Sequence, residues 1–250
     1  MAWLRVPKNR YCLAFALMLF AFGNTAQSVA QSVNPALVPT PKVPKVAIKD
    51  ILKVCFECHG DGGISSVPSR PTIAGQKGNY LARELKAFQK AARKPARDFD
   101  NDAGGVTKKE NESQTMLRAN PVMQHMVKGL NIASITKLSA VLSKMACRKD
   151  KTKIFPKSAP AITKQCILCH GKTGIATQKN APHLAGQRRS YLRRQLLLIR
   201  ESAWGATPRE SENLRTHPIM ESQVARLSIE QVDALAEYYS SQDCRGPTPK

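Results

Sequence analysis

The chain contains the pattern Cys-x-x-Cys-His twice. The two copies are Cys55, Cys58 and His59, and Cys166, Cys169 and His170. On a helix, positions i, i+3 and i+4 lie on one face, so both thiols and the imidazole project from the same side. Two thiols one turn apart can each bond a vinyl group at one haem edge, and the next residue can then offer a ring nitrogen to the iron. The pattern is typical of covalent c-type haem attachment.

Two other uses of paired cysteines suit the pattern less well. A Cys-x-x-Cys pair alone could be a redox dithiol. Two pairs could hold a structural zinc ion, but the pairs of a zinc site lie within roughly a few tens of residues. Cys58 and Cys166 are more than one hundred residues apart. Neither alternative explains a histidine after the second cysteine of both pairs, so the sequence predicts two covalently bound haems.

The start of the chain predicts export. Arg5, Lys8 and Arg10 form a positively charged beginning, and an apolar run of 12 residues follows at 11–22. That run is shorter than the roughly 20 residues that span a bilayer. Small residues follow this run at the positions that a signal peptidase recognises, so we expect residues 1–30 to be a cleaved signal peptide. Because c-type haem is attached outside the bacterial cytoplasm, we expect a periplasmic protein.

From residue 47 onward the chain repeats itself. Cys55 recurs as Cys166 at an offset of 111 residues, and Ala-Gly-Gln and Tyr-Leu segments keep this offset. The offset then falls to 97, so the first copy carries 14 extra residues. We expect this polar insertion at about 96–116, as a flexible surface loop. The expected parts of the exported chain are a proline-rich linker at 31–46, domains at 47–148 and 161–246, and a connecting linker at 149–160.

The apolar spacing is helical in both copies, and no segment alternates as a strand would. In the first copy we expect helices at 49–60, at 80–93 and from Asn131. In the second copy we expect a helix at 191–201 and a closing helix from Ser228, with Gln231 completing a capping box. The sequence therefore predicts an all-α fold.

Each iron needs a second protein ligand. Met220 is the only methionine of the second copy, and the repeat pairs it with Met123 in the first. A lone methionine is usually core filler, but two at matched positions, each after Pro-x and before a closing helix, favour axial ligation. Such a ligand raises the potential of haem iron. The competing candidates are Met116, His125 and Met126 in the first copy and His217 in the second.

These motifs together resemble a known family. Two Cys-x-x-Cys-His-Gly motifs, two Ala-Gly-Gln-x-x-x-Tyr-Leu segments and two Pro-x-Met segments are similar to those of the di-haem class I cytochromes of the cytochrome c4 family. The resemblance covers roughly residues 47–245. It implies two tandem all-α class I cytochrome c domains, related by an approximate twofold axis, that move electrons in the periplasm. It also implies that the carbonyls of Pro71 and Pro182 accept the Nδ1 hydrogens of the haem histidines and orient their rings. We expect His183 at the surface.

Cys147 and Cys244 end the two closing helices at equivalent positions of the repeat. Leftover thiols in an oxidising compartment tend to pair. We therefore expect a disulfide between them, worth about 4 kcal/mol in the chain-entropy model. The alternative is two free, buried cysteines.

The formal net charge is +21, spread over both halves. No basic helix, finger or aromatic RNA-binding signature accompanies it, so we expect no nucleic-acid partner. The simplest interpretation is a solvated surface. The functional interpretation is docking to acidic redox proteins, or peripheral association with an anionic membrane.

Methionine on the second face of each iron would leave no position for a substrate. This favours an electron carrier over an enzyme. We expect a quinol-oxidising complex or a dehydrogenase as donor, and a terminal oxidase or reductase as acceptor. A cytochrome subunit of a periplasmic dehydrogenase complex is the second hypothesis. A di-haem enzyme, such as a peroxidase or thiosulfate dehydrogenase, is the third and would need an open or Cys-ligated haem.

Overall fold

The structure is a computed structural model, and it describes residues 46–93, 116–148, 157–206 and 213–245. These ranges belong to the compact unit Lys45–Lys250. The expected signal peptide, the linker at 31–46 except its last residue, the insertion except residue 116, and residues 149–156 of the connecting linker lie outside the described residues. Within the described ranges, no helix is long and apolar enough to cross a membrane.

The first half of the described chain packs around helix α2. Its elements are α1 (Ile48–His59), the 3-10 turn η2 (Asp61–Gly63), α2 (Gly78–Arg93), α3 (Pro121–Val127) and α4 (Ile132–Lys144). Helix α2 contacts both α3 and α4, and α1 contacts α4. Leu81, Leu138 and Leu142 form the buried core between them.

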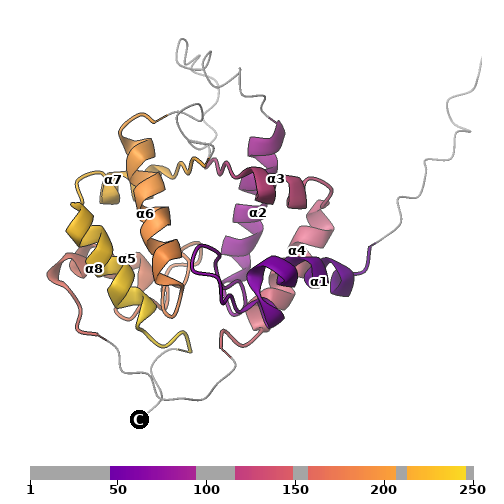
Figure 1. The fold of residues 1–250 in the computed structure, drawn as a ribbon, viewed down its shortest axis with the longest axis horizontal. Helices are drawn as coiled ribbons and strands as arrows, with labels where there is room; N and C mark the ends of the chain where they lie inside the picture. The colour runs from indigo at the N-terminus through magenta and orange to yellow at the C-terminus, as the bar shows by residue number, and fades with distance from the viewer. Residues whose placement is uncertain (1–45, 94–115, 149–156, 207–212, 246–250) are drawn as a thin grey trace, which may run out of the picture. The chain divides into compact units, whose positions relative to one another are not determined.

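The second half repeats this arrangement around α6, as Figure 1 shows. Its elements are the 3-10 helix η3 (Ala161–Gln165), α5 (Ile167–His170), α6 (Arg189–Ala203), α7 (Pro218–Val224) and α8 (Ile229–Ser240). Helix α6 contacts α7 and α8, and its core includes Ile199, Val232 and Leu235. The described residues contain no strand beyond one isolated bridge, between Arg118 and Arg215. The predicted all-α fold is confirmed.

Local signals explain where the helices begin and end. Gly60 follows the last residue of α1 with φ of 81°, a conformation that favours glycine. The Ser228 side chain accepts a hydrogen bond from the Gln231 amide, and the Gln231 side chain accepts one from the Ser228 amide. This confirms the predicted capping box. Asn131 caps α4 by accepting from the Ser134 amide at 2.8 Å.

The helix that carries the haem motif differs between the halves. In the first half it is one continuous helix of 12 residues. In the second half it is broken into η3 and the short α5. The amide and the hydroxyl of Thr163 both donate to the Pro160 carbonyl, at 3.0 and 2.7 Å, and so close a tight turn. The shorter turn still places Cys166, Cys169 and His170 on one side of the chain.

The two halves meet through equivalent segments of the repeat. Residues 117–119 run antiparallel to residues 214–216, with the Ala119 amide donating to Leu214 at 2.8 Å and the Thr216 amide donating to Leu117 at 3.0 Å. Arg118 and Arg215, which the offset of 97 makes equivalent, face each other in this bridge. Pairing of equivalent residues is what an approximate twofold axis between two domains produces.

Candidate functional site

A cavity of about 560 Å³ lies along both halves and brings the predicted site residues together. Both Cys-x-x-Cys-His motifs and both Pro-x-Met segments line it. Its other walls include apolar side chains of α2 and α6, among them Leu81, Leu85 and Leu192. A planar, mostly apolar macrocycle needs such walls, with polar donors only at its centre and edge.

The two haem-motif histidines are buried and oriented by proline carbonyls. His59 Nδ1 lies 2.9 Å from the Pro71 oxygen, and His170 Nδ1 lies 3.1 Å from the Pro182 oxygen. Because a carbonyl oxygen can only accept, each Nδ1 carries the hydrogen. Each Nε2 is then the nitrogen that can bind a metal. These are the two contacts that the family resemblance implied.

The electrostatics keep these imidazoles neutral. Burial lowers the pKa of His59 and of His170 below the ordinary value, and the proline carbonyls oppose this without reversing it. Arg70 lowers the pKa of His59 further. A neutral imidazole is the form that ligates iron.

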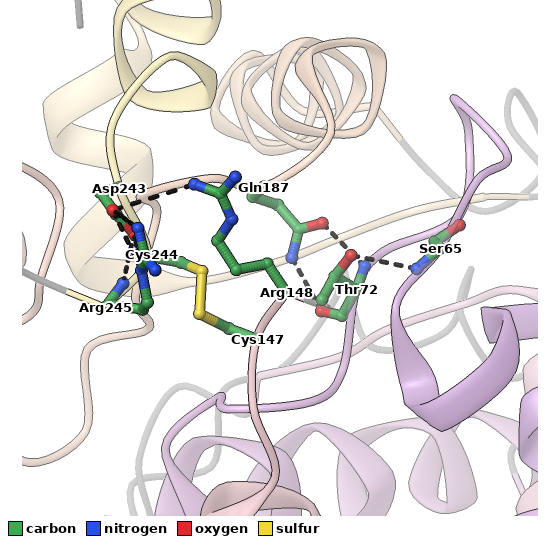
Figure 2. Close-up of a disulfide and its surroundings, with 8 residues drawn as sticks. All are labelled: Ser65, Thr72, Cys147, Arg148, Gln187, Asp243, Cys244 and Arg245. Carbon is green, nitrogen blue, oxygen red and sulfur yellow. Dashed lines mark hydrogen bonds and ion pairs between the residues drawn. A yellow bond between two sulfur atoms is a disulfide. The ribbon is translucent and has the colours of Figure 1, made fainter. Parts of the chain in front are cut away.

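The cysteines of the described residues fall into two groups. Cys55, Cys58, Cys166 and Cys169 are free thiols that line the cavity. Cys147 and Cys244 form a disulfide that joins the segments after α4 and α8, with their Cα atoms 6.2 Å apart (Figure 2). The first group keeps its thiols for thioether bonds, whereas the second has none left to ligate an iron.

The structure places both predicted methionines in the cavity wall. Met123 and Met220 lie in the first turns of α3 and α7, each after a proline that suits the start of a helix. The Met123 amide donates to Asn120 Oδ1 at 2.9 Å. The equivalent Met220 amide donates to His217 Nδ1 at 3.3 Å. Each methionine is therefore held by a helix cap.

The competing candidates have other environments. His125 and Met126 are exposed to solvent. Met116 does not line the cavity. His217 does line it, but its Nδ1 is used as the cap of α7. His183, expected at the surface, is instead half-buried in the cavity wall, with Nδ1 accepting from the Ala176 amide at 2.9 Å.

A buried polar cluster in the cavity wall was missed by the sequence patterns. It consists of Tyr80, Glu84, Arg118, Tyr191, Gln195 and Arg215. Glu84 accepts from Arg118 and, at 3.2 Å, from Arg215. The repeat held a signal for it, because the offset of 111 pairs Tyr80 with Tyr191 and Glu84 with Gln195.

The cluster is asymmetric in charge. Gln195 Oε1 accepts from Arg118 at 3.1 Å and from Arg215 at 2.9 Å, so it bridges the same guanidinium groups as Glu84 without a charge. Burial alone would raise the pKa of Glu84, but Arg215 and Arg118 outweigh it and lower this pKa to about 2. Burial raises the pKa of Tyr80 to about 12. At neutral pH the Glu84 carboxylate therefore lies between the cations Arg118 and Arg215 beside the neutral phenol of Tyr80, and Arg83 contacts the same carboxylate at 3.4 Å.

The sequence is similar to those of known proteins. Residues 158–243 match the family model described as Cytochrome c. A thiosulfate dehydrogenase electron acceptor of Thiomonas intermedia (strain K12) is 26% identical, over 75% of this chain and 78% of its own length. Cytochrome c4 of Stutzerimonas stutzeri is 28% identical, over 74% of this chain and 82% of its own.

Solved structures show the same fold. The crystal structure of reduced recombinant cytochrome c4 from Pseudomonas stutzeri matches with a TM-score of 0.55 and 23% identity, over 78% of this chain and 96% of that one. Thiosulfate dehydrogenase (TsdBA) from Marichromatium purpuratum matches with a TM-score of 0.50 and 24% identity, over 78% of this chain and 38% of that one.

The fold and the site define an all-α class I cytochrome c with two haems, attached covalently at Cys55 and Cys58 and at Cys166 and Cys169. The donor set fits c-type haem, because free thiols, neutral buried imidazoles and apolar walls meet in one cavity. Residues 158–243 are a domain of the Cytochrome c family, and the chain as a whole is similar to the di-haem cytochromes of the cytochrome c4 family.

Proposed function

We propose that this chain is a periplasmic electron carrier. It takes electrons from a dehydrogenase or a quinol-oxidising complex and delivers them to a terminal oxidase or reductase. The observation that carries the proposal is the shared cavity, which His59 and His170 line together with Met123 and Met220. When bound, each c-type haem supplies an iron that takes up and releases one electron.

The chain's residues then have separate roles. His59 and Met123 would hold the iron of one haem, and His170 and Met220 would hold the iron of the other. Pro71 and Pro182 orient the imidazoles. Such a ligand set would leave no position for a substrate at either iron, so the protein would carry electrons rather than act as an enzyme.

Two observations support a dehydrogenase as the donor and docking through charge. The relative in Thiomonas intermedia is named a thiosulfate dehydrogenase electron acceptor, which makes thiosulfate dehydrogenase the first donor to test. The net charge of +21 suits acidic surfaces on both redox partners. The predicted export would bring the chain to such partners in the periplasm.

A permanent subunit of a dehydrogenase complex is the second candidate. The match to 38% of the length of thiosulfate dehydrogenase (TsdBA) from Marichromatium purpuratum favours it, because there a unit of this fold forms part of a dehydrogenase chain. Sedimentation of the protein with thiosulfate dehydrogenase separates the candidates. A complex that persists after dilution to micromolar concentration favours a permanent subunit. A complex that dissociates on dilution favours a free electron carrier.

The absorption spectrum of the oxidised holoprotein tests the axial ligands. We expect a near-infrared methionine-to-iron band whose intensity corresponds to both haems. A high-spin signal from either haem would instead support an enzyme with an open iron.

The salt dependence of electron transfer tests the docking charge. We expect the second-order rate constant with an acidic donor to fall about tenfold or more between low and physiological ionic strength, because exposed charges are screened. Stopped-flow absorbance measures this rate. Reduction by a small neutral reductant is the control and should hardly depend on salt. A protein donor whose rate is equally independent of salt would contradict charge-steered docking.

A further inference from the structure

The Ala-Gly-Gln segments that the repeat singled out reach across the domain interface. Gln187, in the second domain, accepts from the Thr72 amide at 2.8 Å and donates to the Thr72 carbonyl at 2.9 Å (Figure 2). Gln76, in the first domain, makes the same pair of bonds to the His183 amide and carbonyl, at 2.8 and 2.9 Å. Both glutamines are buried, with 7% and 8% of their surface exposed. The contacts are reciprocal.

The residues that the glutamines hold follow the two histidine-orienting prolines. The Pro71 carbonyl and the Thr72 amide belong to one peptide unit, which is planar and rigid. His59 Nδ1 binds the oxygen of this unit, and Gln187 Oε1 binds its hydrogen. The Pro182–His183 unit lies in the same way between His170 and Gln76. One rigid plane therefore connects each imidazole to a side chain of the other domain.

The glutamines are themselves held in place. Gln76 Oε1 also accepts from the Lys77 amide at 2.9 Å, and Gln187 Oε1 from the Arg188 amide at 3.0 Å. The residue before Gln187 is Gly186, where an added Cβ would lie 3.0 Å from the Cβ of Cys244. The residue before Gln76 is Gly75, where an added Cβ would lie 2.8 Å from the Cβ of Cys147. Both segments are thus packed directly against the disulfide.

We propose that each glutamine is a positioning residue for the haem of the opposite domain. Gln187 fixes the plane that orients His59, and Gln76 fixes the plane that orients His170. Hydrogen bonds in a chain also polarise one another, so the amide bond strengthens the proline oxygen as an acceptor and tunes the imidazole. The inference rests on the axial roles of His59 and His170 in the proposed function.

Two reciprocal variants of the holoprotein test the proposal. Methionine has nearly the length of glutamine but forms neither hydrogen bond, so the variants are Gln187→Met and Gln76→Met. We expect Gln187→Met to shift the reduction potential of the first-domain haem more than that of the second. We expect Gln76→Met to show the reverse pattern. Spectroelectrochemistry gives the potentials, and nuclear magnetic resonance of the oxidised protein assigns each to its haem.

Amide hydrogen exchange provides a second readout that does not depend on measuring a reduction potential. The Thr72 amide should exchange faster in Gln187→Met, and the His183 amide faster in Gln76→Met. If either methionine variant does not fold, Gln187→Asn and Gln76→Asn replace them, because asparagine is too short by one methylene. Arg188→Met is the control. Arg188 donates across the interface to the Ser66 carbonyl at 3.0 Å without touching Thr72, and its loss should leave Thr72 exchange unchanged.

The outcomes separate this inference from the proposed function. Equal shifts of both potentials, or a shift only of the haem in the variant's own domain, would overturn the positioning role. Such a result would leave the wild-type near-infrared bands in place. A high-spin wild-type haem would instead overturn the axial assignment itself, whatever the variants show.

Discussion

At the scale of single residues, Glu84 breaks the symmetry of the repeat. Its equivalent, Gln195, bridges the same two guanidinium groups without a charge. Glu84 is 6% exposed, so its carboxylate neutralises Arg118 and Arg215 where water does not. Removing one member of a buried ion pair leaves the other charges uncompensated, which costs far more than losing an exposed pair.

We expect Glu84→Gln to lower the free energy of unfolding by about 3–5 kcal/mol. Denaturant titration measures this. Asp233→Asn is the matched control, because it makes the same acid-to-amide change in the more exposed pair with Arg193. That control should cost about 1 kcal/mol or less. Equal costs for both variants would contradict the role of burial.

The depressed pKa of Glu84 also predicts a pH dependence. The pKa falls from an ordinary value near 4.5 to about 2 in the folded protein. Its contribution to stability is therefore fully present above the ordinary value and is lost as the pH falls through about 2. The difference in unfolding free energy between wild type and Glu84→Gln should shrink over this window. A constant difference down to pH 2 would argue against this titration.

Met123 and Met220 carry the third prediction at this scale. Met220→Ala should open one iron, replace its near-infrared band by a high-spin signal and lower its potential, because the thioether ligand raises it. Met123→Ala should do the same for the other haem. Met126→Ala is the control, because its side chain is exposed. An unchanged spectrum in either of the first two variants would reject that methionine as a ligand.

At the scale of elements, the helices follow from short-range signals. Observed α1, α2 and α6 agree with the predicted bounds within two residues at each end. The capping box of α8 was predictable because its two residues are three positions apart. The break between η3 and α5 was not predicted, because segments of 5 and 4 residues are too short to distinguish the 3-10 spacing from the α-helical spacing.

The cap of α8 gives the prediction at this scale. Ser228→Ala removes the acceptor for the Gln231 amide and should cost about 1 kcal/mol of unfolding free energy. Thermal denaturation measures it. Ser222→Ala is the control. The exposed Ser222 hydroxyl donates to the Ile219 carbonyl within α7, so its loss should change stability by about 0.5 kcal/mol or less. A larger cost for Ser222→Ala would show that the cap is not the cause.

At the scale of the whole molecule, the disulfide and the polar cluster join two domains that each contain a core. The disulfide joins two residues that are 97 positions apart in the sequence. Restricting so long a loop in the unfolded chain stabilises the folded state by about 4 kcal/mol in the chain-entropy model.

We therefore expect the double variant Cys147→Ser, Cys244→Ser to have a free energy of unfolding about 4 kcal/mol lower than that of the wild type and to unfold at a lower temperature. Calorimetry of the holoprotein measures both. Mass spectrometry after alkylation without reductant checks the bond in wild type, where Cys147 and Cys244 should take up no label. Two labels on these residues would show that they are free thiols.

Sequence patterns alone predicted the haem motifs, the tandem repeat, the matched methionines and helices α1, α2, α4, α6 and α8. These depend on residues a few positions apart, or on comparison of one half with the other. Only the tertiary structure decided which side chains meet across the interface. Gln187 contacts Thr72 over a separation of 115 residues, and Glu84 contacts Arg215 over 131. Such pairs leave no local pattern, because they depend on how two finished domains dock and on which buried polar groups must then find partners.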